Sequence, residues 1–174
     1  MEDPLISGVA HDRSQAKVTV IDVPDVPGSA SRVFEAVAAA GVNLDMIVQN
    51  VPTTKGSGVT DISFTLNSEH AETAANALRE RKDEIGYYDV VFDNGVGKLS
   101  LVGAGMRSHP GVAAKLFGAI RDAGINIEMI STSEIRISVI TRRRDLDKAV
   151  RAVHEAFDLD ADEIEAVVYG GTGR

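Results

Sequence analysis

Two short turns in the sequence carry residue types that could bind a small charged molecule. Asp25-Val26-Pro27-Gly28 and Ser108-His109-Pro110-Gly111 each stand before an apolar helical pattern. The first turn of a helix offers unpaired N–H groups and a partial positive charge, which suit a carboxylate. Glycine allows a ligand to approach the backbone closely, and Asp25 adds an acceptor for an ammonium group. A free amino acid carries both charges, so these turns predict an amino-acid site.

The simpler interpretation of the same residues is structural. Asp25 and Ser108 belong to the residue types that cap helix N-termini. Pro27 and Pro110 are typical of the first helical position, where proline loses no needed N–H. The residue types alone leave the structural and the binding interpretation open.

No catalytic or metal-binding set accompanies these turns. The chain has four widely separated histidines, His11, His70, His109 and His154. None has the spacing of a metal ligand, so we expect surface or capping roles, no metal and no cofactor. Arg142-Arg143-Arg144 is expected to be a solvated loop before a helix that starts near Asp145.

One segment allows a nucleotide-binding interpretation. Val102 to Ser108 contains two glycines and lies between a strand pattern and a helix pattern, as a dinucleotide-binding loop does. Glu128 follows at roughly the separation of the acid that binds a ribose. However, Ser108 replaces the third glycine and the helix begins late, near Pro110. A nucleotide site is therefore disfavoured.

Composition excludes several classes of function. The chain has 174 residues, 44% of them hydrophobic and 25% charged, which is typical of a folded protein. A formal charge of −8 disfavours nucleic-acid and anionic-membrane partners, which need a positive surface. The absence of cysteine excludes disulfides, thiol nucleophiles and cysteine-bound zinc. No apolar run approaches the roughly 20 residues of a membrane span, and the start is acidic, so we expect a cytoplasmic protein.

An internal repeat positions the two turns. Asp25–Asn50 and Ser108–Ser133 align without gaps at an offset of 83 residues, with ten of 26 positions identical. The identities include the Pro-Gly pair, a phenylalanine and a Gly-x-Asn step. This period is too long for a solenoid and predicts two small domains of about 75 residues each.

Each copy shows the same order of patterns. Apolar residues recur at helical spacing after the Pro-Gly pair, in the first copy at Ala30, Val33, Phe34 and Val37. Strict alternation at Ile62–Leu66 and Ile135–Val139 predicts strands with one buried face. The remaining strands are expected at Val18–Ile21, Leu44–Val48, Tyr87–Phe92, Leu99–Val102, Ile127–Ile130 and Ala166–Tyr169. The order strand-helix-strand-strand-helix-strand, twice, predicts an α+β protein with two ferredoxin-like domains.

The same segments resemble the ACT domain, a small ligand-sensing module of amino-acid metabolism. The Asp-x-Pro-Gly turn and the Ala-Gly-Val-Asn-Leu segment carry this likeness. Longer strings resemble the tandem ACT regulatory region of the aspartate kinase (aspartokinase) family, among them VIDVPDVPGSASRVF, SHPGV and NIEMISTSEIRISV. The resemblance covers Leu5 to Arg174, while the family's kinase domain, with its Lys-Phe-Gly-Gly-type motif, has no counterpart. It implies a non-catalytic regulatory (beta) subunit or an excised regulatory region.

In this family one ACT domain is inserted within the other. The resemblance therefore implies that residues 1–16, with a strand at Leu5–Ala10, join the sheet of the second domain. Residues 17–93 would form ACT domain 1, residues 94–170 ACT domain 2, and residues 171–174 a flexible tail. The resemblance also implies a homodimer whose ACT sheets pair, with the aspartate kinase catalytic subunit as partner.

The effectors of the family are threonine, lysine or both in concert. The resemblance implies a threonine site made by Asp25, Gly28, Ala30 and Gln49, with Asn126 and Ile127 from a second ACT domain. A pseudo-equivalent site for lysine would use Gly111, Ala113, Ser131 and Ser133 with Asn43, Leu44 and Asp45. Asp45 or Glu128 would accept the side-chain ammonium of lysine. Occupation of these sites would mediate feedback inhibition.

Two other classes of function stay open. One is a freestanding ACT sensor that regulates a different biosynthetic enzyme, such as acetohydroxy-acid synthase. The SHPGV and MISTSEI strings disfavour it. The other is an enzyme built on the ferredoxin-like fold, because fold does not determine function. The lack of a convergent acid–base or metal set disfavours that class.

Overall fold

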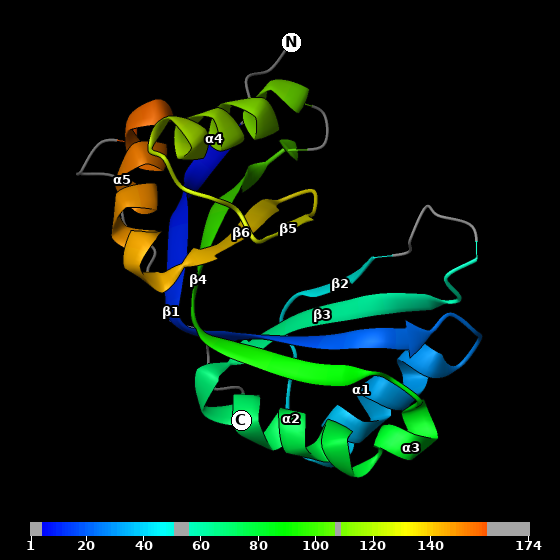
Figure 1. Ribbon diagram of the computed structural model, residues 1–174. Helices are drawn as coiled ribbons and strands as arrows, with labels where there is room; N and C mark the ends of the chain where they lie inside the picture. The colour runs from blue at the N-terminus through cyan, green and yellow to red at the C-terminus, as the bar shows by residue number, and fades with distance from the viewer. Residues whose placement is uncertain (1–4, 51–55, 107–108, 160–174) are drawn as a thin grey trace. The chain divides into compact units, whose positions relative to one another are not determined.

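The computed structural model describes residues 5–50, 56–106 and 109–159 (Figure 1). The chain divides into two compact units. The first unit is Ser14–Asn94, and the second unit combines the residues up to Arg13 with those from Gly95 onward. Two long strands, β1 (Leu5–Pro24) and β4 (Asp89–Ala104), each contribute one part to either unit. In sequence, the first unit is thus inserted within the second.

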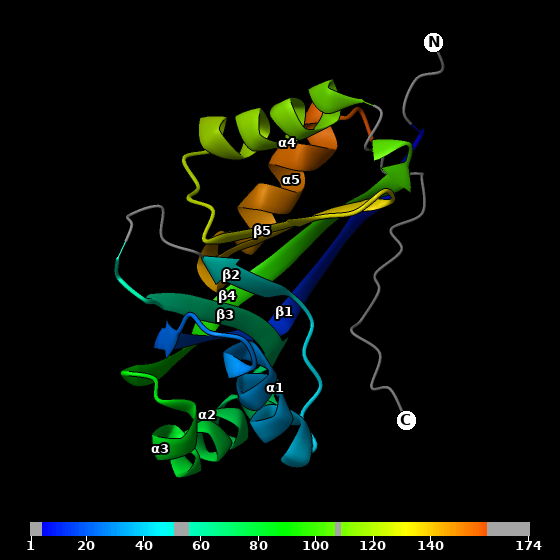
Figure 2. The same cartoon turned by 90° about the vertical axis from the view of Figure 1, so that its right-hand side faces the viewer.

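The first unit is an antiparallel sheet covered on one face by helices. Between its two long strands the chain forms α1 (Ser29–Ala39), β2 (Ile47–Asn50), β3 (Val59–Asn67), η1 (Ser68–His70), α2 (Ala71–Glu80) and α3 (Lys82–Ile85). The strands lie in the order β2-β3-β1-β4, and the β2–β3 and β1–β3 pairs are antiparallel. Helices α1 and α2 lie on the same face of this sheet in both views (Figures 1 and 2).

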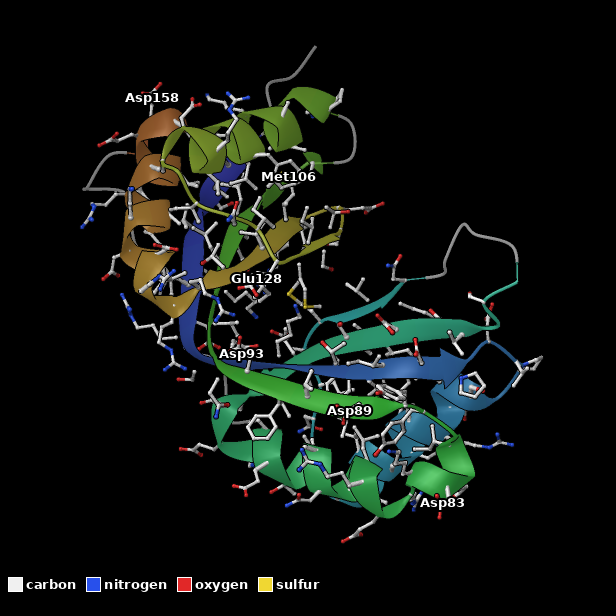
Figure 3. The ribbon with its side chains drawn as sticks, viewed as in Figure 1. Asp83, Asp89, Asp93, Met106, Glu128 and Asp158 are labelled. Carbon is white, nitrogen blue, oxygen red and sulfur yellow. The ribbon has the colours of Figure 1, made fainter. Side chains whose placement is uncertain are left out.

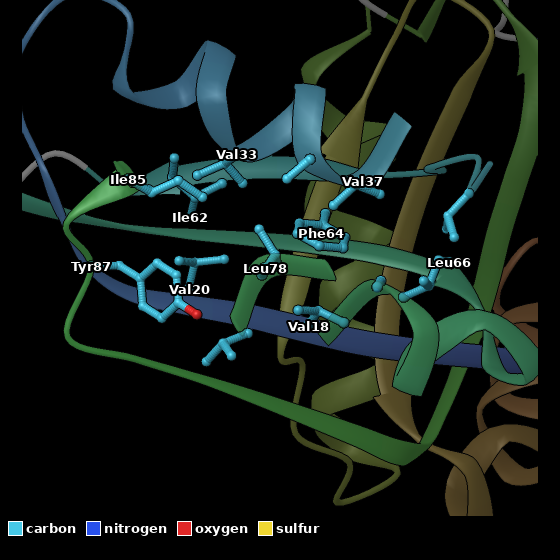
Figure 4. Close-up of a cluster of buried hydrophobic side chains, with 14 of the residues drawn as sticks. Val18, Val20, Val33, Val37, Ile62, Phe64, Leu66, Leu78, Ile85 and Tyr87 are labelled. Carbon is cyan, nitrogen blue, oxygen red and sulfur yellow. The ribbon is translucent and has the colours of Figure 1, made fainter. Parts of the chain in front are cut away.

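The core of the first unit lies between its sheet and its helices (Figure 4). Val18 and Phe64, which are partners in the β1–β3 register, are fully buried together with Leu78 of α2. Phe34 meets Phe64 edge to face, with 6.4 Å between the ring centroids, which is a favoured arrangement. Tyr87 joins this core, and desolvation by burial raises the pKa of its phenol above the usual value. Burial of each such large side chain stabilises the unit by about 1.5–3 kcal/mol.

Along strand β3, the apolar side chains are buried as predicted, but the polar side chains do not all face water. Ile62, Phe64 and Leu66 are buried, but Thr65, predicted to face water, is fully buried as well. The Thr65 hydroxyl accepts the N–H of Met46 at 3.0 Å, which compensates for its burial. The Thr65 carbonyl accepts the N–H of Asp45 at 2.8 Å and the Thr65 N–H donates to the carbonyl of Met46 at 2.9 Å, so two residues oppose one. The regular part of the second strand begins after this irregularity, at Ile47 rather than at Leu44.

The second unit has the same organisation. It contains α4 (Pro110–Asp122), β5 (Met129–Thr132), β6 (Arg136–Arg142), η3 (Arg143–Asp145) and α5 (Leu146–Ala156). Its strands lie in the order β1-β4-β6-β5, with antiparallel β4–β6 and β5–β6 pairs. The core joins both helices to the sheet through residues such as Leu101, Leu116 and Val153. Val9 belongs to the same core, so the N-terminal part of β1 serves as the last strand of this unit.

The first unit follows the order strand-helix-strand-strand-helix-strand, with its last strand beside its first. The described part of the second unit has the same arrangement, with the N-terminal part of β1 in the place of the last strand. The predicted α+β fold with two ferredoxin-like domains is confirmed. The strand expected at Ala166–Tyr169 and the tail at residues 171–174 lie outside the described residues.

The second unit departs from the predicted pattern around its hairpin. β5 begins at Met129 rather than two residues earlier, and Arg143–Asp145 forms a short 3-10 helix rather than a loop. The N–H of Ile135 donates to the Ser133 hydroxyl at 3.4 Å, which folds Ile135 into the turn and leaves it 59% exposed. Ser138, predicted to face water, is buried, and the hydrogen bond between its hydroxyl and that of Ser100 at 2.7 Å compensates for this burial.

Val9→Asp tests whether the second unit needs the N-terminal part of β1. Val9 is 6% exposed in the core of this unit, and a buried unpaired carboxylate is strongly destabilising. We expect amide hydrogen exchange to become at least about tenfold faster in β6, while protection in β3 is retained. Ser7→Asp, which adds the same charge at an exposed position of β1, is the control. Equal protection of β6 in the two variants would contradict this role of the strand.

Candidate functional site

A pocket of about 360 Å³ lies in the first unit where β1 ends and α1 begins. Its walls come from the β1–α1 turn, the first residues of α1 and the β2–β3 hairpin. The lining residues are Val23, Pro24, Asp25, Val26, Pro27, Gly28, Ser29, Ala30, Gln49, Thr60 and Ile62. Four residues predicted for the first effector site therefore meet in one cavity, namely Asp25, Gly28, Ala30 and Gln49.

Backbone hydrogen bonds and one left-handed glycine hold the β1–α1 turn. The N–H of Asp25 donates to the carbonyl of Gly58 at 2.9 Å, which ties the end of β1 to the hairpin. Gly28 has a φ of +92°, a conformation that residues with side chains rarely adopt. A Cβ at this position would meet no atom within 4 Å, so the backbone conformation, not close packing, requires glycine. The N–H of Ser29 donates to the carbonyl of Val26 at 3.2 Å, and α1 begins there.

The interpretation of Asp25 as a helix cap is wrong. The N-cap of α1 is Gly28, and no side chain caps the first turn. Because the left-handed glycine delays the helix, Arg32 is the residue whose N–H bonds back to the carbonyl of Gly28, at 3.1 Å. The N–H groups of Ala30 and Ser31 are therefore the donors that this helix start leaves for a ligand.

Charged and amide groups stand at the rim of the pocket, and buried groups form its floor. Asp25 is exposed, and its carboxylate has no hydrogen bond or ion pair with any residue that the structure describes. Gln49 is also exposed and is the register partner of Ile62, so both point to the same side of the sheet. Thr60 and Ile62 are 2% and 1% exposed, and the Thr60 hydroxyl donates to the carbonyl of Asn50. The site thus combines an anionic acceptor, an amide and helix N–H donors with a largely apolar floor.

Sequence reasoning missed the floor of this pocket. The predicted apolar stripe is Ala30, Val33, Phe34 and Val37. Val33 and Val37 are buried, and Ala30 and Phe34 pack partly buried against the core, but the prediction left out the buried Ser29 and Ala36. Ser29 is at helical spacing from Val33 and Ala36, but a polar serine gives no sign in the sequence that it is buried. Thr60 and Ile62 reach the pocket through the register of β3, which spacing along the chain does not reveal.

The other predicted site residues belong to different parts of the fold. Asn126 and Ile127 lie in the second unit, between α4 and β5, and do not line this pocket. Of the second predicted site, the second unit contains Gly111, Ala113, Ser131 and Ser133, and the first unit contains Asn43, Leu44 and Asp45. The structure therefore assembles one part of the first site in a single cavity and divides the second site between the units.

The second Pro-Gly turn differs locally from the first. α4 begins at Pro110 with His109 as its N-cap, so Gly111 is already a helical residue. In the first copy, the equivalent Pro27 and Gly28 both precede the helix. The prediction of proline at the first helical position is thus confirmed for α4 and wrong for α1. Ser108, the other expected cap, lies outside the described residues.

Glu128, which is labelled in Figure 3 and was considered as an acceptor for a lysine side chain, already has a partner. Arg142 donates through Nε and Nη2 to the two carboxylate oxygens of Glu128, at 2.8 and 3.0 Å. Such a bidentate ion pair is among the stronger hydrogen-bonded interactions in proteins. The side chain of Arg142 is only 31% exposed, and that of Glu128 only 27%. This pairing argues against Glu128 as the acceptor for a ligand ammonium.

Residues 5–50, 56–106 and 109–159 contain neither a metal-binding cluster nor a membrane-spanning helix. No three or more acidic or histidine side chains gather there into a group that could hold a metal ion. Among the helices of the described ranges, none is both long and apolar enough to cross a lipid bilayer.

Comparisons with known proteins match both units. Models of the ACT domain match residues 17–83 and 99–157. The regulatory subunit of aspartate kinase from Thermus thermophilus has a TM-score of 0.82 and 42% identity, with 88% of this chain and 99% of that chain covered. The chain belongs to the aspartokinase family. Within that family it corresponds to the regulatory region, and each unit is an ACT domain.

Two further aspartokinases define the extent of the match. One from Mycolicibacterium smegmatis is 57% identical over 174 residues, and the chain spans 41% of the length of that relative. Aspartokinase III from E. coli, solved in complex with lysine and aspartate, shares the fold with a TM-score of 0.67 at 22% identity, over 89% of this chain and 34% of that chain. The Mycolicibacterium smegmatis aspartokinase therefore matches this regulatory region over all 174 residues of the chain.

In this aspartokinase regulatory region, Asp25→Ala should leave folding almost unchanged. Loss of an N-cap side chain costs about 1 kcal/mol, but Asp25 caps nothing. We expect the free energy of unfolding in urea to change by less than about 0.5 kcal/mol. Asn67→Ala is the matched control, because Asn67 Oδ1 accepts the N–H of Glu69 at 2.9 Å and caps η1. It should lose about 1 kcal/mol, and a similar loss in Asp25→Ala would restore the capping interpretation.

Proposed function

We propose that this chain is the non-catalytic, allosteric part of a cytoplasmic aspartate kinase, and that it binds threonine, in concert with lysine, for feedback inhibition. The observation that carries the proposal is the pocket at the start of α1, which gathers Asp25, Gly28, Ala30 and Gln49. Membership of the aspartokinase family supports the regulated reaction, the ATP-dependent phosphorylation of aspartate by a catalytic chain. The regulatory chain has no kinase activity of its own in this proposal.

The pocket suits threonine by its arrangement of charge. The α-carboxylate lies at the start of α1, where the N–H groups of Ala30 and Ser31 and the helix dipole favour an anion. The exposed carboxylate of Asp25 accepts the α-ammonium group. Gln49, at the rim, has an amide that can hydrogen-bond the ligand. The volume of about 360 Å³ is at the small end of ligand pockets, which fits a single amino acid better than a nucleotide.

A second ACT domain completes the threonine site in this proposal. Asn126 and Ile127 from a second copy of the chain close over the ligand in a homodimer whose ACT sheets pair. Such pairing also covers strand edges, which otherwise present unpaired backbone groups. The similar Thermus thermophilus protein is itself a regulatory subunit, which supports assembly with a separate catalytic chain.

Lysine is the second proposed effector. Support comes from aspartokinase III of E. coli, which was solved with lysine and aspartate. The proposed lysine residues are Gly111, Ala113, Ser131 and Ser133 together with Asn43, Leu44 and Asp45. Because α4 begins at Pro110 and α1 begins only after Gly28, the two sites differ in local geometry, which supports different ligand preferences.

Inhibition requires each effector to prefer one of two arrangements of the enzyme. A ligand that binds both arrangements equally shifts nothing, however tightly it binds. A tenfold change needs about 1.4 kcal/mol of differential binding. Threonine held between ACT domains of two chains meets this requirement, because it contacts both domains only in the arrangement that closes the site.

A thermal-shift screen of the purified chain tests the ligand. The chain is heated with threonine, lysine, methionine, isoleucine or valine in separate samples. Threonine at 100 times its Kd should add about 2.7 kcal/mol of stability and raise Tm, because it binds only the folded state. A rise with valine alone would favour a sensor for a different biosynthetic enzyme. Failure of every amino acid to raise Tm would contradict threonine binding by this chain.

Ala30→Thr tests the position of the site. Ala30 lines the pocket beside the proposed carboxylate position, so the added side-chain atoms should displace the ligand. With the catalytic chain present, we expect the threonine concentration for half-inhibition to rise by at least about tenfold. Ala38→Thr makes the same change at an exposed position of α1 and should inhibit like wild type. Unchanged inhibition in Ala30→Thr would count against the site.

A further inference from the structure

Ser29 is a buried residue whose hydroxyl lacks a hydrogen-bond partner. It is the first residue of α1 and is 3% exposed, and its Oγ bonds to none of the residues that the structure describes. Ser29 is also one of the residues that line the pocket. Buried polar groups are nearly always hydrogen-bonded, and an unpaired one destabilises the fold. The hydroxyl of Ser29 therefore needs an explanation.

Folding does not provide that explanation. The Ser29 side chain does not cap α1, which has no side-chain cap. Alanine would occupy the same helical position with a better helix propensity and without a buried unpaired oxygen. Ser31, two residues further along α1, shows the contrast, because it is exposed and its hydroxyl donates to Glu35 at 2.9 Å.

The surroundings of Ser29 combine one uncommitted hydroxyl with apolar surface. Val23 and Ile62, which also line the pocket, are 0% and 1% exposed. Thr60 lines it too, but its hydroxyl hydrogen is committed to the carbonyl of Asn50. The floor therefore matches a ligand side chain that carries both a hydroxyl and a methyl group.

On the basis of the proposed function, we infer that Ser29 distinguishes a β-hydroxy amino acid from its apolar isostere. The side-chain hydroxyl of threonine pairs with Ser29 Oγ, and its methyl group contacts Val23 or Ile62. Because Ser29 lines the pocket and its hydroxyl has no hydrogen bond, pairing with the ligand costs no existing bond. Valine has a methyl group in place of the hydroxyl, so it leaves Ser29 unpaired.

Gln49 cannot supply the same selectivity, because it is exposed. When a ligand offers no hydroxyl, water hydrogen-bonds an exposed amide at little cost. A buried hydroxyl has no water to replace the missing partner. Sites that bind a substrate hydroxyl through buried groups reject the analogue lacking it far more strongly than an apolar pocket rejects a change of one methyl group. Ser29 therefore sets the choice between side chains, and Gln49 adds contact at the rim.

Isothermal titration of the purified chain with L-threonine and L-valine tests this role. Wild type should bind threonine at least about tenfold more tightly than valine. In Ser29→Ala the ratio should fall below about threefold, mainly through weaker threonine binding. Ser68→Ala makes the same change in η1, outside the pocket, and should keep the wild-type ratio. Urea unfolding of Ser29→Ala should show stability equal to or above that of wild type, which establishes that the variant folds.

The possible results separate this role of Ser29 from the proposed function. A wild-type preference for threonine that Ser29→Ala retains would overturn the role of Ser29 and leave the threonine site intact. Equal binding of threonine and valine by wild type would overturn that role as well. Loss of selectivity in Gln49→Ala but not in Ser29→Ala would assign the choice to Gln49. Failure of wild type to bind either amino acid would overturn the proposed function together with the role of Ser29.

Discussion

The left-handed conformation of Gly28 is the constraint on which the candidate site depends. It separates the end of β1 from the start of α1, so that the helix begins at Ser29 with an uncapped first turn. The hydrogen bond from the Asp25 N–H to the Gly58 carbonyl holds the other side of the turn against the β2–β3 hairpin. A residue with a side chain at position 28 would resist this conformation. The pocket, its N–H donors and the exposed carboxylate of Asp25 all follow from it.

The two copies of the repeat show that one fold can contain two kinds of turn. Pro27 and Pro110 are equivalent in sequence, yet α4 begins at Pro110 and α1 begins two residues after Pro27. Gly111 is a residue of its helix, whereas Gly28 is left-handed and precedes its helix. The same pair of residues thus starts a helix directly in one ACT domain and helps to form a pocket in the other. Under the proposed function, ligand preference resides in the local site and not in the shared fold.

The fold could be predicted from the sequence because each pattern of strands and helices occurs twice. The rim of the site could be predicted because most of its residues are adjacent in the chain. The floor could not be predicted, because it depends on the rotation of α1 about its axis and on strand register, which only packing decides. Ser29 was overlooked for this reason. Thr65 and Ser138 were expected to face water, but each hydroxyl is buried with a hydrogen-bond partner. The alternation of apolar and polar residues along a strand indicates which side chains are polar. It cannot show that a hydrogen bond compensates for the burial of a polar side chain.

Under the proposed function, affinity and selectivity in this pocket come from groups in different environments. In the proposed function, the carboxylate of Asp25 and the N–H groups at the start of α1 bind the ammonium and carboxylate groups that every free amino acid carries. These groups therefore recognise amino acids in general and do not distinguish one from another. Discrimination among members requires contact with the side chain in a place where water cannot replace a missing partner. A buried hydroxyl such as that of Ser29 meets this condition, at a cost to folding of about 1–3 kcal/mol. Because functional sites commonly retain such locally unfavourable groups, an orphan hydroxyl beside a pocket is a stronger indication of what the pocket binds than the charges at its rim.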